Sequence, residues 1–103
     1  MISVLATVEL QAGCREEFLA EFRKVVPLVR QEAGCIEYFP AIDLETGLAA
    51  QPVLRPDVVM VIEKWSDLDA LRAHLVAAHM QEYRQRVKPF VSKTIVQVLQ
   101  SAE

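Results

Sequence analysis

The sequence predicts an α+β fold built on one four-stranded antiparallel sheet, with helices on one of its faces. Three observations support this class. Four segments have the alternation or the composition of strands, and three others place apolar side chains at helical spacing. Along the chain these segments follow the order βαββααβ. This order is ferredoxin-like, with strands and helices in two packed layers.

The first predicted strand and helix occupy the N-terminal third of the chain. Apolar side chains alternate from Ile2 to Leu10, as in a strand with one buried face. A helix is expected from Arg15, and Gly34 is expected to end it as a left-handed C-cap. Pro27 has no backbone N–H and predicts a kink or early fraying inside this helix. The apolar positions at helical spacing are Phe18, Leu19, Phe22, Val25, Val26 and Val29.

The next segment predicts a strand followed by a long connection. Cys35 to Asp43 is rich in strand formers, and Pro40 within it indicates an edge position or a bulge because proline cannot donate to a neighbouring strand. The connection from Leu44 to Pro56 is longer than the about two to five residues usual in a hairpin. We expect this connection to form an arm or a lid.

The third predicted strand leads into a helix that carries a histidine. Val58 to Trp65 begins with apolar side chains on both faces, so both faces must be covered. Ser66 is expected to N-cap a helix from Asp67. The apolar stripe of this helix would consist of Leu68, Leu71 and Leu75.

The two histidines decide how this helical region is interpreted. In one continuous helix His74 and His79, five residues apart, would lie on different faces. A break at Ala77-Ala78 would let them converge, and we favour the break. A third helix would then turn Met80, Tyr83 and Val87 inward, and Val91 to Leu99 would form the last strand.

The composition predicts one domain over residues 1–103 that pairs with a second copy. Apolar residues make up 52% of the chain, above the roughly 45–50% of soluble proteins. The first, third and fourth strands carry apolar side chains on both sides, and helices would cover only one side. A homodimer is the commonest way for a small chain to bury such a face.

Charge and motif content exclude several classes of partner. The net charge of −3 and the absence of a basic cluster beside an aromatic platform argue against nucleic acid. No apolar run approaches the roughly 18 residues of a membrane span, and we expect a cytoplasmic protein. Cys14 and Cys35 have no metal-ligand spacing, and no glycine-rich nucleotide loop is present. We therefore expect no metal and no bound cofactor.

Two stretches of the chain resemble a known family. Residues 32–39 (EAGCIEYF), after an amphipathic helix, and residues 61–87 (VIEKWSDLDALRAHLVAAHMQEYRQRV) are similar to the antibiotic biosynthesis monooxygenase family. The resemblance implies a dimeric α+β barrel. It also implies the oxidation of a small quinol or phenol by molecular oxygen without metal or flavin, although relatives on the same barrel degrade haem.

The histidines are the candidate catalytic residues. A cofactor-free oxygenase needs a base that deprotonates a phenolic hydroxyl, because the resulting anion can pass an electron to O2. His79 is the first candidate, since a position at a helix start disfavours the charged imidazole and keeps it available as a base. His74 is expected to assist. Each histidine is also consistent with a purely structural role.

The candidate substrate-binding residues are aromatic or apolar. Trp65 could stack on a planar aromatic substrate, and the Tyr38 hydroxyl could orient a substrate oxygen. The remaining candidates for the pocket wall are Phe22, Phe39, Met60 and Phe90. A core role explains Trp65 and Tyr38 equally well, and it is the favoured interpretation of the other four. A non-catalytic dimeric ligand-binding module, a haem-degrading enzyme and a sugar mutarotase or isomerase therefore remain alternatives to the monooxygenase.

Overall fold

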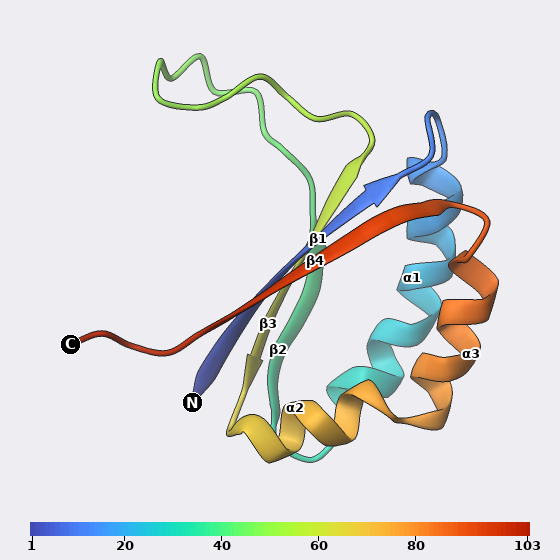
Figure 1. The fold of residues 1–103 in the computed structure, drawn as a ribbon, viewed down its shortest axis with the longest axis vertical. Helices are drawn as coiled ribbons and strands as arrows, with labels where there is room; N and C mark the ends of the chain where they lie inside the picture. The colour runs from blue at the N-terminus through green and yellow to red at the C-terminus, as the bar shows by residue number, and fades with distance from the viewer.

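The computed structural model describes residues 1–103 and confirms the α+β class. A four-stranded antiparallel sheet and three helices follow the order βαββααβ (Figure 1). The elements are β1 (Ile2–Leu10), α1 (Arg15–Arg30), β2 (Cys35–Ala41), β3 (Val58–Trp65), α2 (Leu68–Leu75), α3 (Ala78–Val87) and β4 (Val91–Leu99). None of the helices has the length and apolar character needed to cross a membrane.

The strand order β2-β3-β1-β4 places β1 and β3 in the middle of the sheet. Ala6 of β1 pairs with Val61 of β3 on one side and with Val96 of β4 on the other. Strand β2 lies at the edge, so Pro40 occupies the position predicted for it. The register between β2 and β3 shifts next to Cys35, as in a β-bulge.

All three helices cover the same face of the sheet, and the core lies between the two layers (Figure 1). Alternation along β1 and β3 sends every second side chain toward the helices, and the six apolar positions predicted for α1 are all buried there. Met80, Tyr83 and Val87 of α3 close the core as predicted. The opposite face of the sheet has no helix on it.

The C-terminal part of α1 differs from the prediction in two ways. The helix continues past Pro27 to Arg30, so of the kink or early fraying expected there, the fraying does not occur. The helix is capped by Gln31 in a right-handed conformation and not by Gly34. Gly34 does have a positive φ of 81°, but it uses this conformation in the turn before β2. There a Cβ atom would lie 2.5 Å from Ser66 Oγ and 2.6 Å from the Cβ of Ala70, so close packing also requires glycine.

The start and the apolar face of α2 also differ from the prediction. Asp67, not Ser66, is the N-cap, because its carboxylate accepts from the backbone N–H of Ala70 at 2.8 Å. Leu68 and Leu75 are exposed, so the predicted stripe is reduced to Leu71. His74 takes the second buried position of this helix. A short amphipathic helix thus turns an imidazole, rather than a leucine, toward the core.

The connection between β2 and β3 forms an arm without regular secondary structure, from residue 42 to residue 57, that extends away from the body of the molecule (Figure 1). Strand β2 ends at Ala41, two residues earlier than predicted. The base of the arm is closed by Arg55, whose guanidinium makes two bonds to the Asp43 carboxylate, at 2.7 and 2.9 Å. This pairing lowers the pKa of Asp43 to about 2.

Candidate active site

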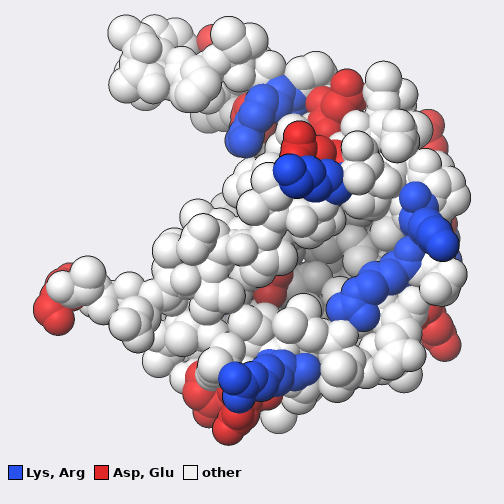
Figure 2. Space-filling view, in the orientation of Figure 1, with Lys and Arg blue, Asp and Glu red and all other residues white.

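One cavity of about 610 Å³ lies between the helix-covered face of the sheet and helix α3. Figure 2 shows this cavity as a hollow in the surface, with basic side chains at its edge. Arg84 and Lys88 are the basic residues that line it. Most of the side chains around it are apolar, and the full set is Ala6, Val8, Phe22, Tyr38, Val61, Glu63, His74, Leu75, Met80, Tyr83, Arg84, Gln85, Val87, Lys88, Val91, Thr94 and Val96. Its volume falls within the roughly 300–1,000 Å³ typical of small-molecule sites.

Both histidines converge on a single carboxylate, that of Glu32. Helix α2 ends at Leu75 and α3 begins at Ala78, so the helical region breaks between the two histidines as predicted. Glu32 lies in the turn between α1 and β2. Its Oε2 atom is 2.9 Å from His74 Nδ1 and 2.6 Å from His79 Nε2. Three residues from three different segments therefore form one hydrogen-bonded array.

The carboxylate determines which ring nitrogen of each histidine carries a hydrogen. An ionised carboxylate only accepts hydrogen bonds, so His74 Nδ1 and His79 Nε2 must both be donors. In the neutral His74 ring the other nitrogen, Nε2, then has a free lone pair. His74 Nε2 has no hydrogen-bond partner within the protein. No buried polar side-chain atom of the protein lacks a partner, so Nε2 must be accessible, and His74 lines the cavity. This arrangement presents a proton acceptor to the cavity.

Burial and Glu32 act in opposite directions on His74. Its side chain is 2% exposed, and this burial lowers the pKa of the imidazole because a charged ring would lose its hydration. The Glu32 carboxylate raises the same pKa by hydrogen bonding and by charge. The loss of hydration is the larger effect. His74 is therefore neutral, and able to accept a proton, at neutral pH.

An aromatic cluster holds His74 in position. Its ring centroid is 4.7 Å from that of Trp65 and 5.4 Å from that of Tyr38, and Tyr38 stacks on Phe22 at 5.5 Å. Such contacts contribute about 0.5–1.5 kcal/mol each beyond simple burial. Trp65 is completely buried behind the cavity wall. Its indole therefore supports His74, while Tyr38 and Phe22 reach the cavity surface.

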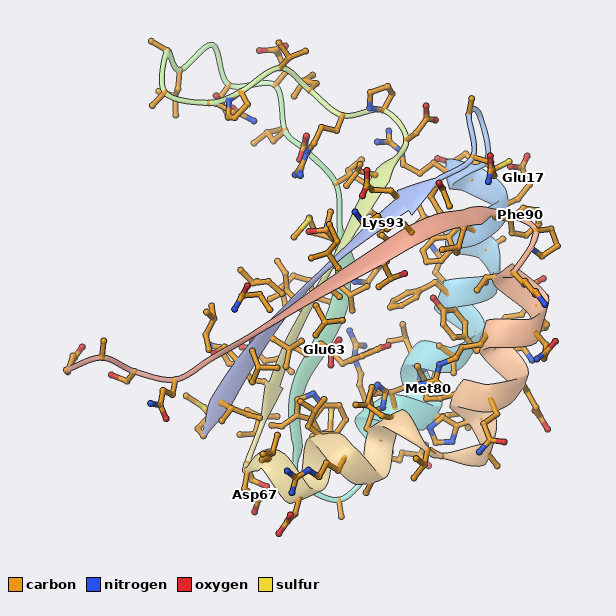
Figure 3. The ribbon with its side chains drawn as sticks, in the orientation of Figure 1. Glu17, Glu63, Asp67, Met80, Phe90 and Lys93 are labelled. Carbon is orange, nitrogen blue, oxygen red and sulfur yellow. The ribbon has the colours of Figure 1, made fainter.

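A second carboxyl group, that of Glu63, lies on the cavity wall. Strand alternation points Glu63 to the same side as Val61 and Trp65, toward the helices, where Figure 3 shows it between the strands and Met80. Its Oε1 accepts the Trp65 Nε1–H at 2.9 Å. The pKa of Glu63 is raised to about 7, chiefly by burial; the hydrogen bond from the indole lowers this pKa and the Glu32 charge raises it.

Comparison with known proteins places these features in a family. The sequence profile of the family described as "Antibiotic biosynthesis monooxygenase" matches residues 1–86. The chain belongs to this family. The match includes both histidines, Glu32, Glu63 and the strand tryptophan, whereas β4 lies beyond it.

Relatives of this monooxygenase family cover almost the whole chain. "Probable quinol monooxygenase YgiN" of Escherichia coli (strain K12) is 35% identical over 102 residues, which are 97% of each chain. A crystal structure described as an antibiotic biosynthesis monooxygenase superposes with a TM-score of 0.82 at 21% identity and covers both chains completely. The crystal structure of PA3566 from Pseudomonas aeruginosa gives a TM-score of 0.80 at 22% identity, over 99% of this chain and 94% of that one. The two structures confirm the fold.

The structure separates the eight residues that the sequence singled out into two groups. His74, Tyr38 and Phe22 line the cavity. The other five do not reach it, for different reasons. His79 is linked to the cavity residue His74 only through Glu32, and Trp65 lies behind His74. The remaining three are Phe39, Met60 and Phe90.

Strand alternation explains the placement of Phe39 and Met60. Phe39 pairs with Ile62 and Met60 pairs with Thr7, so both side chains lie on the face of the sheet that no helix covers. Phe90 lies in the turn before β4, where it packs against the edge of the core. Aromatic or apolar character alone does not show which face of a sheet a residue occupies.

Sequence reasoning missed two residues of this site, Glu32 and Glu63. A signal for Glu63 exists: it shares its alternation with Val59, Val61 and Trp65, and this pattern places a carboxyl group on a buried strand face, where one is unusual. Nothing local distinguishes Glu32 from the other acidic residues of α1 and its end. Its position becomes informative only when helices α2 and α3 bring the histidines to it.

Proposed function

We propose that this protein is a monooxygenase that oxidises a small quinol with molecular oxygen, uses no metal or flavin, and works as a homodimer. The observation that carries the proposal is the orientation of His74 by Glu32, which leaves a free imidazole nitrogen at an otherwise largely apolar cavity. The substrate class follows the name of the relative YgiN, and the reaction type follows the family.

The first step is the removal of a phenolic proton. His74 Nε2 accepts the proton, which leaves an electron-rich anion in a cavity with few polar groups. Glu32 stabilises the charged imidazole that forms, because it already accepts the hydrogen bond from Nδ1. Phe22 and Tyr38 form an aromatic part of the wall against which a planar ring fits.

His79 provides the way out for that proton. Its side chain is 25% exposed, and it binds the same Glu32 oxygen as His74. A proton can therefore pass from His74 through the carboxylate to His79 when His79 changes to the tautomer in which Nδ1 carries the hydrogen and Nε2 is free to accept. In this proposal His74 is the base and His79 the relay, the reverse of the roles that the sequence suggested, because only His74 lies at the cavity.

The electron balance explains why the reaction needs no cofactor. A quinol and O2 give a hydroxyquinone and one water: one oxygen atom enters the ring and the other leaves as water. The four electrons that reduce O2 all come from the aromatic substrate. The anion passes one electron to O2, the two radicals combine at a ring carbon, and no external reductant is consumed.

The exposed sheet face supports the dimer in this proposal. Leu5 and Ile95, which lie on the face opposite the helices, are 37% and 46% exposed. Phe39, Met60 and Ile62 occupy the same face. An apolar face of this kind is rarely left open in a monomer, and a second sheet packed on it would bury it.

A second candidate is an acid–base isomerase. Two titratable side chains, His74 and Glu63, face one cavity, and a pair of this kind can move a proton between two substrate atoms without oxygen. The two candidates differ in their need for O2. Turnover under argon would favour the isomerase.

Oxygen consumption with a naphthoquinol tests the proposal. Wild type should exceed the autoxidation rate, and His74→Ala should lower kcat about 10²–10⁴-fold because it removes the base. His79→Ala should cost less, since the base remains. Variants are compared only if their thermal unfolding matches wild type, because His74 is also a core residue. Uptake at the autoxidation rate, or an unaffected His74→Ala, would contradict the proposal.

A further inference from the structure

The buried residues of this protein include only two with a polar or charged side chain, His74 and Glu63, and both line the same cavity. His74 has been assigned above. Glu63 is 6% exposed and has no cationic partner: it forms no salt bridge, and its one hydrogen bond comes from the Trp65 indole. A buried carboxyl group without a charge partner weakens a fold, so its presence on a cavity wall indicates a function.

The second oxygen of Glu63 is available to a ligand. Oε1 accepts from Trp65, whereas Oε2 has no partner within the protein and is not fully enclosed. Figure 3 shows Glu63 pointing from β3 toward the helices, and Figure 2 shows an acidic side chain at the same place inside the hollow. The indole fixes one end of the carboxyl group and leaves the other end facing the cavity.

No basic side chain bonds to Glu63. The ionisable groups that face it or line the same cavity are Tyr38 and Cys35 of β2, Glu32 before β2, His74 of α2, Tyr83 and Arg84 of α3, and Lys88 directly after α3. Arg84 donates instead to the backbone oxygen of Leu75. The nearby charge that acts on Glu63 is that of Glu32, which favours the protonated form.

We propose that Glu63 is the proton donor that releases the second oxygen atom of O2 as water, while His74 handles the proton of the substrate. This inference rests on the proposed monooxygenase function. It assigns the two groups of one cavity to opposite steps, as acid and as base. A buried carboxyl group that holds its proton up to about neutral pH, with no cation bonded to it, is suited to donate.

The chemistry balances with these two groups. After the ring carbon has bonded to O2, the peroxide anion takes back the proton that His74 holds, so this carbon carries a hydrogen and a hydroperoxide. The C–H bond then breaks and its proton goes to His74, which is neutral again; its electron pair forms the C=O bond, and the O–O bond breaks. The departing hydroxide takes the proton of Glu63 and leaves as water. Glu63 is left as a carboxylate and regains a proton before the next turnover.

The pKa of Glu63, raised to about 7 by burial, sets the pH range in which this donor works. Below that value the carboxyl group holds its proton, and above it the proton is lost. Activity should therefore decline as the pH rises through 7. His74 must be neutral to act, so activity should also decline on the acid side, and the profile should be bell-shaped.

Glu63→Gln is the test, because an amide oxygen still accepts the Trp65 indole hydrogen but has no proton to give. Glu37→Gln, on the exposed part of β2, is the matched control. Two products are measured with a naphthoquinol: hydroxyquinone and hydrogen peroxide. In Glu63→Gln hydroxyquinone formation should fall about 10²-fold or more and the alkaline limb should vanish, while oxygen uptake persists and peroxide is released.

A measurement without substrate separates this inference from the function on which it rests. Infrared titration of the protonated carboxyl band should show one group near pH 7 in wild type and in Glu37→Gln, and none in Glu63→Gln. No such band, or an unchanged product ratio in Glu63→Gln, would overturn the role of Glu63 alone. Absence of oxygen uptake in wild type would overturn both proposals, even with the band present.

Discussion

Glu32 is the residue on which the two histidines depend. Its single carboxylate accepts from both rings, although it is separated from them by 42 and 47 positions along the chain. Because one oxygen, Oε2, serves both contacts, a change at Glu32 affects the orientation of both rings and the protonation of His74 together. Glu32 is therefore a positioning residue, which acts on the reaction through His74. The pH dependence of activity distinguishes this role from a merely structural one, because loss of a structural residue would not move the pKa of His74.

Replacing this carboxylate by an amide should change the pH profile in a defined direction. The charge and hydrogen bond of Glu32 raise the pKa of His74, while burial lowers it. Glu32→Gln removes the raising contribution, so the pKa falls further and the acid limb of kcat/KM moves to lower pH. We expect kcat to fall as well, since the amide can offer its N–H to the ring and so select the wrong tautomer.

The measurement is kcat/KM for quinol oxidation between pH 4 and pH 9. Glu82→Gln, an exposed carboxyl on α3 outside the cavity, is the control and should match wild type. An acid limb that stays in place in Glu32→Gln would show that His74 is not the group that titrates. An acid limb that moves to higher pH would contradict the conclusion that Glu32 raises the pKa of His74.

At the scale of elements, the turn between α1 and β2 connects the helical layer to the sheet. It carries Glu32 and Gly34, and the backbone oxygen of Gly34 accepts from the N–H of Ser66 at 2.8 Å. The end of β3 and the start of α2 therefore rest directly on this turn. Any side chain at position 34 would separate these elements and would displace Glu32 from the histidines.

Gly34→Ala should destabilise the protein more than an alanine at another left-handed glycine. Gly13 has nearly the same φ, 77°, but nothing lies within 4 Å of the Cβ it would gain. Gly13→Ala thus reports backbone strain alone, about 1–2 kcal/mol. Gly34→Ala adds steric overlap with Ser66 and Ala70. Thermal or denaturant unfolding compares the two, and equal losses of stability would rule out the close-packing argument.

At the scale of the whole molecule, the two faces of the sheet differ in what covers them. The helices bury one face and form the cavity there, whereas the other face presents apolar side chains without cover. Strand β4 is exposed along almost its whole length. A second copy packed against this face would complete the fold, and the cavity would stay within each subunit.

A charged substitution on the open face should dissociate the proposed dimer. Ile95→Lys places a charge on β4, on the side away from the helices, where a second sheet would pack. Leu68→Lys is the control, because Leu68 is almost as exposed but lies on the surface of α2. Sedimentation velocity at micromolar concentration should show dimers of wild type and of Leu68→Lys, and monomers of Ile95→Lys. A monomeric wild type would contradict the proposed pairing.

The sequence by itself determined the elements and their order, because strand and helix periodicities are local. Alternation from Ile2 to Leu10 and from Val58 to Trp65, and the helical spacing after Arg15, each extend over a few turns or pleats and agree with the structure. The break between His74 and His79 was also predictable, since a continuous helix would have separated them. The ends of the helices were less predictable, because the caps of α1 and α2 depend on which backbone groups find hydrogen-bond partners.

Only the tertiary structure decided which of these residues form a site. Contact between His74, His79 and Glu32 requires the turn after α1 to meet the break between α2 and α3, and no periodicity encodes an approach over more than 40 positions. The same holds for the faces of the sheet. Met60 and Phe39 have the composition of a pocket wall, yet strand pairing turns them away from the cavity and turns the carboxyl group of Glu63 into it.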